Sequence, residues 1–122
     1  MTDSISRDDV WPDDLDALRA APRHHTLVLE NAAVRVLETR IPAGERTAVH
    51  THRWPSVLHI LSWSAMVRRD ANGSVTFDSR TQPPSDVPAG ILWSPALPAH
   101  SLENVGTADI HVIAVEVKAG AV

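Results

Sequence analysis

Three histidines are the residues of this chain best suited to chemistry: His50 and His52, separated by one residue, and His100 much farther along. Side chains alternate between the two faces of a β-strand, so His50 and His52 share a face and can offer one ring nitrogen each to a common ion. Imidazole nitrogens bind divalent transition metals at about 2.0–2.1 Å. Pro95 and Pro98 precede His100, where a distant strand can bring a third imidazole to the first two. The pattern predicts a metal site.

The segments around these histidines resemble the two motifs of the cupin superfamily. The matching positions are Gly44, His50 and His52 in the first motif, and Pro95 or Pro98, His100 and Asn104 in the second. The resemblance implies a small single-domain cupin, a β-barrel of the double-stranded β-helix or jelly-roll type over residues 25–118. It also implies that the three histidines are the metal ligands. We interpret Asn104 as a residue that hydrogen-bonds at a turn or strand end.

The first cupin motif also carries a glutamate ligand, which this chain lacks. The glutamate position falls at Ser56 or Val57, and neither has a carboxylate. If Ser56 takes the position, which we favour, His59 faces away from the site; if Val57 takes it, His59 faces inward and can serve as a further ligand. Ser56 is best interpreted as a small residue that fills the vacated position.

Without the glutamate, three neutral imidazoles leave both charges of a divalent ion uncompensated. Such a set disfavours Mg²⁺ and Ca²⁺ and suits iron in the first place, with nickel, zinc, manganese or copper as alternatives. It also favours an anionic substrate at the open coordination positions. Cupins with three-histidine iron sites include thiol dioxygenases and β-diketone-cleaving dioxygenases. We therefore expect a metal-dependent enzyme acting on a small organic molecule, in its most concrete form a dioxygenase, with a non-catalytic module that binds a small ligand as the alternative.

Further side chains are candidates for the substrate pocket. Arg46 shares the phase of the two paired histidines, so it either holds a substrate anion or, as we favour, sits at the rim beside a surface acid. Trp93 lines or plugs the barrel, and its contact with substrate is left open. His24, His25 and His111 are predicted to lie in solvent. The predicted pocket residues are Arg46, Ser56, His59 and Trp93.

The elements that must position these residues are mostly strands. Short, β-branched segments separated by turn residues predict an all-β fold. Asn72-Gly73 predicts a type I′ hairpin, and segments 82–90 and 94–100 are typical of turns. In front of them, a helix of two to three turns is expected between Pro12 and Pro22. The predicted strands cover 25–30, 33–41, 46–52, 56–63, 65–69, 74–79, 90–94 and 110–118.

Length and composition fit one domain, with an N-terminal segment at 1–24 followed by the barrel. The chain has 122 residues and a formal net charge of −4, and no dense run of basic residues points to nucleic acid. It has no cysteine, no signal-like start and no run of about 18 apolar residues, so we expect a cytoplasmic protein without a membrane partner. Many small cupins pair through a helix or an edge strand, and we expect a homodimer here.

Overall fold

The strands form two antiparallel sheets in a computed structural model that describes residues 11–82 and 90–118. One sheet has the order β1-β2-β9-β4-β7, and the other has the order β3-β8-β5-β6. The helical elements are η1 (Asp13–Leu15), α2 (Ala17–Ala20) and η2 (Ser79–Thr81). The strands are β1 (His25–Glu30), β2 (Val34–Ile41), β3 (His50–His52), β4 (Ser56–Ser62), β5 (Met66–Asp70), β6 (Val75–Asp78), β7 (Gly90–Ser94), β8 (Leu97–Asn104) and β9 (Ile110–Val117).

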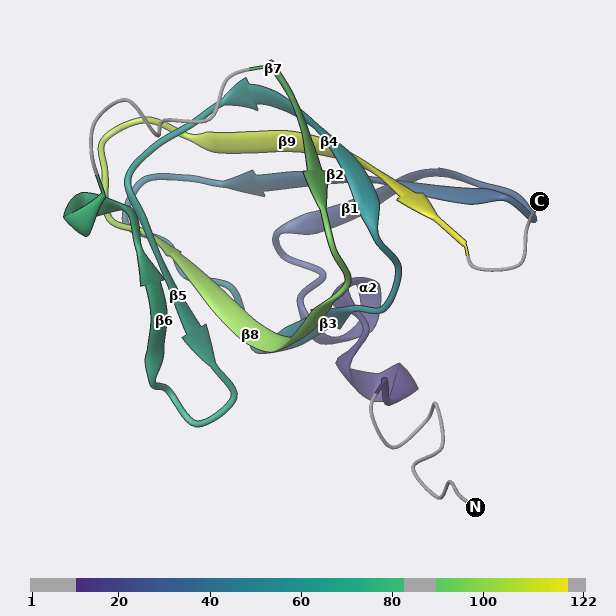
Figure 1. Cartoon of the computed structure of the whole chain (residues 1–122), viewed down its shortest axis with the longest axis horizontal. Helices are drawn as coiled ribbons and strands as arrows, with labels where there is room; N and C mark the ends of the chain where they lie inside the picture. Colours follow the sequence, from purple (N-terminus) through teal and green to yellow (C-terminus); the bar gives the residue numbers. More distant parts are fainter. Residues whose placement is uncertain (1–10, 83–89, 119–122) are drawn as a thin grey trace.

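The two sheets face each other and enclose an interior (Figure 1). The predicted all-β, double-stranded β-helix architecture is confirmed. One segment differs, because β8 begins at Leu97, inside the segment 94–100 that was predicted to be a turn. Pro98 is tolerated there because β8 pairs with β3 through His50 opposite His100 and His52 opposite Leu97, with a register shift between the two pairs. The predicted turn at 82–90 falls on positions 83–89, outside the described residues.

The hairpin between β5 and β6 forms, but the predicted type I′ turn is wrong. That turn needs two residues with positive φ, and Gly73, with φ of +88°, is the one residue of the loop that has it. The Asp70 carboxylate accepts hydrogen bonds from the backbone N–H of Asn72 at 2.9 Å and of Ser74 at 3.0 Å. With these bonds to Asp70, the φ of Asn72 is not positive.

The N-terminal helix is shorter than predicted. It divides at Asp16, whose ψ of 142° is extended, into the turn η1 and the four-residue α2. The Asp16 side chain caps α2 by accepting from the Leu18 N–H at 3.1 Å. The same carboxylate binds Arg35 on β2, and this tertiary contact fixes the break. No helix among the residues described is long and apolar enough to cross a membrane.

The buried face of strand β9 spans both the hydrophobic core and the polar part of the interior. Its buried residues alternate as Ile110, Val112, Ala114 and Glu116, so a carboxylate occupies the last inward position of an otherwise apolar face. Ile110 and Val112 pack with residues of β2 and β5 in the hydrophobic core. Glu116, only 1% exposed, therefore lies where the core ends and the polar part of the interior begins.

Candidate metal site

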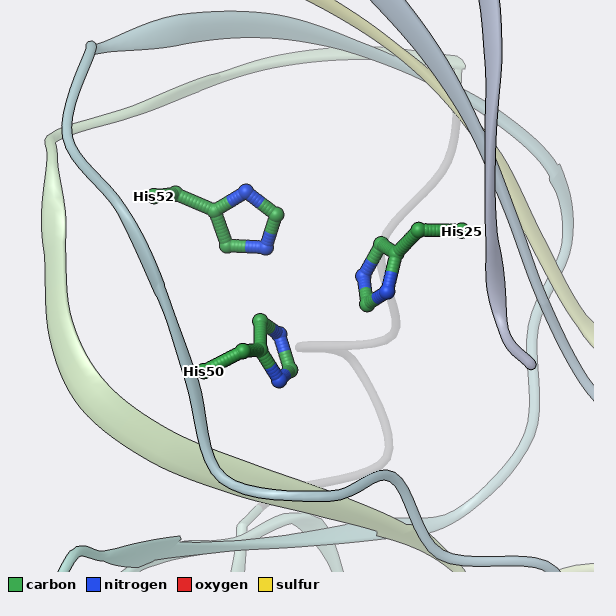
Figure 2. A group of neighbouring side chains, drawn as sticks. All are labelled: His25, His50 and His52. Carbon is green, nitrogen blue, oxygen red and sulfur yellow. The ribbon is translucent and has the colours of Figure 1, made fainter. Parts of the chain in front are cut away.

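Three imidazole rings converge inside the barrel (Figure 2). One ring nitrogen each from His25, His50 and His52 lie within 4.8 Å of one another. His25 begins β1, and His50 and His52 are the two ends of β3. Three nitrogens that share one ion at about 2.1 Å lie about 3.0–3.6 Å apart, so an ion would draw nitrogens at the 4.8 Å limit together by about 1.2–1.8 Å. The cluster is close to the dimensions that a transition metal needs.

A fourth ring, that of His100, lies beside this group but is not one of the three whose nitrogens lie within 4.8 Å of one another. Its centroid lies 4.5 Å from the His50 ring and 5.7 Å from the His52 ring. The three histidines of the sequence motifs are thus neighbours in space. His25 lies on the other side, with ring centroids 4.6 Å from His50 and 5.3 Å from His52.

The prediction that His25 lies in solvent is wrong, since it is 4% exposed. It is buried because β1 pairs with β2, where His25 lies opposite Thr39. No motif in the sequence marks this position. His24 is buried too, with its Nε2 2.8 Å from a Glu45 carboxylate oxygen, and His111 bonds Glu38 at 2.6 Å. These two histidines hydrogen-bond carboxylates outside the group.

Hydrogen bonds orient all four rings in the same sense. The Nδ1 atoms lie next to oxygen atoms, as follows: His25 with Ala21 O (3.0 Å), His50 with Ala48 O (2.8 Å), His100 with Pro98 O (2.7 Å) and His52 with Glu116 Oε2 (3.0 Å). A main-chain carbonyl can only accept, so Nδ1 carries the hydrogen in the first three, and an ionised carboxylate requires the same of His52. Each ring therefore turns Nε2 away from these oxygen atoms, and a neutral ring in this tautomer binds metals through Nε2.

Burial keeps the imidazoles of His25, His50 and His100 uncharged. It lowers the pKa of His25 and His50 to about 3, with repulsion between neighbouring imidazoles as a further cause. Burial also lowers the pKa of His100 to about 4. Near neutral pH these side chains are neutral donors, ready for an ion without first losing a proton.

The carboxylate missing from the motif is replaced by one behind the ligands. Ser56, at the glutamate position, is buried and lies opposite Glu116 in the pairing of β4 with β9. Glu116 accepts from His52 through one oxygen and from the Nε of Arg35 through the other, at 2.7 Å. A carboxylate in this place fixes the tautomer of the ligand and raises its basicity.

Arg35 ties this arrangement to the N-terminal segment. Its two terminal nitrogens donate to the Asp16 carboxylate at 2.9 and 2.8 Å, and the guanidinium lies 5.0 Å above the Trp54 ring. Burial would raise the pKa of Asp16, but the bonds from Arg35 outweigh it and the pKa is lowered. The two carboxylates and one guanidinium carry a net charge of −1, which partly compensates a bound cation.

A cavity of about 120 Å³ extends from the histidines to the core. Of the predicted pocket residues, Ser56 lines it. Arg46 is exposed and its backbone bridges Glu103, while His59 is exposed on the outer side of β4. Trp93 is 62% exposed, because its neighbour Ser94 takes the inward position of β7. Polar and apolar side chains on the cavity wall include His25, Ile41, His50, His52, Leu58, Met66, Arg68, His100, Ile110 and Val112.

Asn104, matched to the second motif, acts as the predicted strand-end hydrogen-bonder. Its side-chain nitrogen donates to the carbonyl oxygens of Ile41 and Ala108, both at 2.8 Å, and its oxygen accepts from the Gly106 N–H at 3.0 Å. All its polar atoms are used in shaping the loop after β8. It is not available to an ion.

Comparison with solved structures identifies the architecture. A cupin domain from Bordetella pertussis Tohama I superposes with a TM-score of 0.60 at 24% identity, over 78% of this chain and 92% of that one. An RmlC-like cupin family protein from Methanocaldococcus jannaschii gives 0.53 at 13% identity, over 76% and 77%. A protein with a double-stranded β-helix domain from Klebsiella pneumoniae gives 0.52 at 21%, over 80% and 78%. No family model and no curated protein matches the sequence. The two facing antiparallel sheets and these likenesses together show that the chain has the cupin fold.

Proposed function

We propose that this protein is a metal-dependent enzyme that acts on a small organic molecule. The metal is bound by His50, His52 and His100, the ligands expected from the motifs, together with His25. The observation that carries the proposal is the set of four imidazoles around one cavity, each with Nδ1 bonded to an oxygen and Nε2 free. The four histidines line one cavity, so Nε2 atoms that have no partner among the described residues would be available to a shared cation there.

The donor set points to a transition metal. Neutral nitrogen ligands suit Fe²⁺, Ni²⁺, Cu²⁺ or Zn²⁺ and disfavour Mg²⁺ and Ca²⁺, which prefer oxygen. We place iron first because a dioxygenase is the most concrete activity that a histidine-only site supports. Such an ion supplies Lewis acidity and open positions for ligands.

The chain's own residues have two tasks in this scheme. The hydrogen bonds on Nδ1 hold the rings so that Nε2 of His50 and its neighbours stay aimed at one place. The apolar walls formed by Leu58, Met66 and Val112 exclude water from the cavity and favour a substrate with an apolar body. The volume of about 120 Å³ restricts that substrate to a few non-hydrogen atoms.

The test is anaerobic reconstitution of untagged protein with Fe²⁺, followed by O₂ uptake on a panel of thiols and β-diketones. We expect turnover that disappears in His50→Ala and persists in His59→Ala, a matched change at an exposed histidine. Tight metal binding without turnover across a wide panel would contradict the enzyme and favour the non-catalytic binding module. Absence of metal binding would contradict both versions of the site.

We also propose that two copies pair through β1. Leu27, Val28 and Leu29 are 44%, 54% and 48% exposed, so this outer strand presents apolar side chains on both faces beside an open backbone edge. A second copy of the same strand supplies matching apolar side chains and hydrogen-bonding groups. We expect light scattering to give a dimer for the wild type and a monomer for the double variant Leu27→Lys and Leu29→Lys. A wild-type monomer at micromolar concentration would contradict the pairing.

The cytoplasmic location stays a prediction.

A further inference from the structure

Arg68 is a cation on the cavity wall that the sequence did not single out. It lies in the middle of β5, between Leu102 on β8 and Phe77 on β6. Met66, two residues earlier and in the same phase of the strand, lines the same cavity. Arg68 therefore brings a guanidinium to the space bounded by His100 and the other imidazoles.

The charge of Arg68 is not compensated by the protein. Among the residues described, no carboxylate lies within 4.0 Å of its guanidinium, and its Nε is buried without a hydrogen-bond partner. The adjacent Arg69, by contrast, donates to Glu103 at 2.8 Å. Asp70 lines a second cavity of about 210 Å³ together with Arg68 and His100, and forms no ion pair with Arg68 among the residues described. A buried donor left unsatisfied is a sign of a missing partner.

The surroundings make the missing partner an anion. Burial lowers the pKa of Arg68, with no acid to oppose the effect, whereas Arg35 in its carboxylate pair has a raised pKa. Arginine remains protonated near neutral pH even so. None of the described residues that line the cavity is acidic, so the guanidinium stands in a mostly apolar cavity without a counter-charge. A ligand with one negative charge balances it.

We infer that Arg68 binds the carboxylate of a small monocarboxylic acid whose apolar body lies against Ile41, Leu58 and Met66. The planar fork of a guanidinium matches a carboxylate with two parallel hydrogen bonds. The cavity of about 120 Å³ is close to the ~150 Å³ of an apolar cavity that admits benzene, so the acid is small. That this acid is the substrate class rests on the proposed function. In this arrangement Arg68 holds the carboxylate, and the other end of the acid lies beside the histidines.

Butyrate and butyramide test the inference, because they have the same size and shape and differ in charge. Binding to the full-length chain is measured by titration calorimetry, once with chelator present and once after loading with Zn²⁺. We expect butyrate to bind about ten- to hundredfold more tightly than butyramide, the range for a hydrogen bond to a charged group. The preference should vanish in Arg68→Met and persist in Arg69→Met, which removes the same charge from the next position.

Equal binding of the two probes, or no binding of butyrate to the wild type, would overturn the inference. So would a preference for butyrate that persists in Arg68→Met, because the anion would then be held by the metal or the imidazoles. If Arg68→Met does not fold by circular dichroism, Arg68→Gln takes its place with the same expected loss. The measurement with chelator is independent of the metal, so failure of the metal site and failure of the carboxylate site give different results.

Discussion

Replacement of Glu116 by glutamine isolates the effect of the carboxylate behind the metal ligands. Glu116 accepts from two donors, His52 Nδ1 at 3.0 Å and Arg35 Nε at 2.7 Å. Glutamine has one oxygen and one NH₂ group, so it can accept from only one of these donors and turns its own donor toward the other. Removing such a partner of a ligand typically lowers metal affinity about 10- to 100-fold. This corresponds to about 1.4–2.7 kcal/mol, at 1.36 kcal/mol per decade.

The stability of the metal-free protein should also fall in Glu116→Gln, because a buried charged hydrogen bond is lost. The cost is about 1.5–3 kcal/mol, below that of a fully broken buried pair, since Arg35 keeps both bonds to Asp16. Zn²⁺ affinity is measured by competition with a chromophoric chelator, and stability by urea unfolding with EDTA. Glu38→Gln is the matched control, because Glu38 bonds His111 in a partly buried pair away from the cavity. A Zn²⁺ affinity of Glu116→Gln within twofold of wild type would refute the proposed support of His52.

Three further predictions concern the same region. Arg35→Met leaves two carboxylates buried without their cation and should destabilise the metal-free protein by about 3–5 kcal/mol in urea unfolding; a loss below 1 kcal/mol would contradict the pair. His25→Gln should lower Zn²⁺ affinity at least about tenfold while His59→Gln does not, and equal affinities would remove His25 from the site. Metal-free stability should fall on acidification, since the three cavity histidines with lowered pKa take up protons near pH 6.5 when unfolded but near 3–4 when folded. Their contribution to the free energy of unfolding is complete above about pH 6.5 and declines as the pH falls toward the folded pKa. The slope reaches about 4 kcal/mol per pH unit, because three protons contribute about 1.36 kcal/mol each. Urea midpoints that stay constant from pH 7 to 5 would contradict this prediction.

The strands could be predicted because β-branched residues mark half-buried strands and turn residues mark their ends, and both signals lie in short stretches of sequence. The predicted segments 25–30 and 90–94 coincide with β1 and β7. The start of β8 was missed because Pro98 is typical of a turn, and only pairing with β3 keeps it in a strand. The N-terminal helix was overestimated because Asp16 caps the short α2 and is held by Arg35 across the fold, a contact that no local pattern records.

The site could be predicted only where it is encoded locally. The pair His50 and His52 follows from spacing, but His25 and Glu116 reach the histidines through the pairing of β1 with β2 and of β9 with β4, which no short motif records. Arg46 was placed by counting alternate residues back from His50. That count fails because β3 begins at His50, so the preceding segment is not a regular strand.

Elemental analysis combined with X-ray absorption on untagged protein, purified without added metal, tests the central claim most directly. We expect close to one transition-metal ion per chain, with nitrogen neighbours at about 2.0–2.1 Å and no thiolate. We also expect the ion to be lost in His50→Ala and in His52→Ala alike. Less than a tenth of an equivalent of metal, both as purified and after incubation with Fe²⁺ or Zn²⁺, would contradict it.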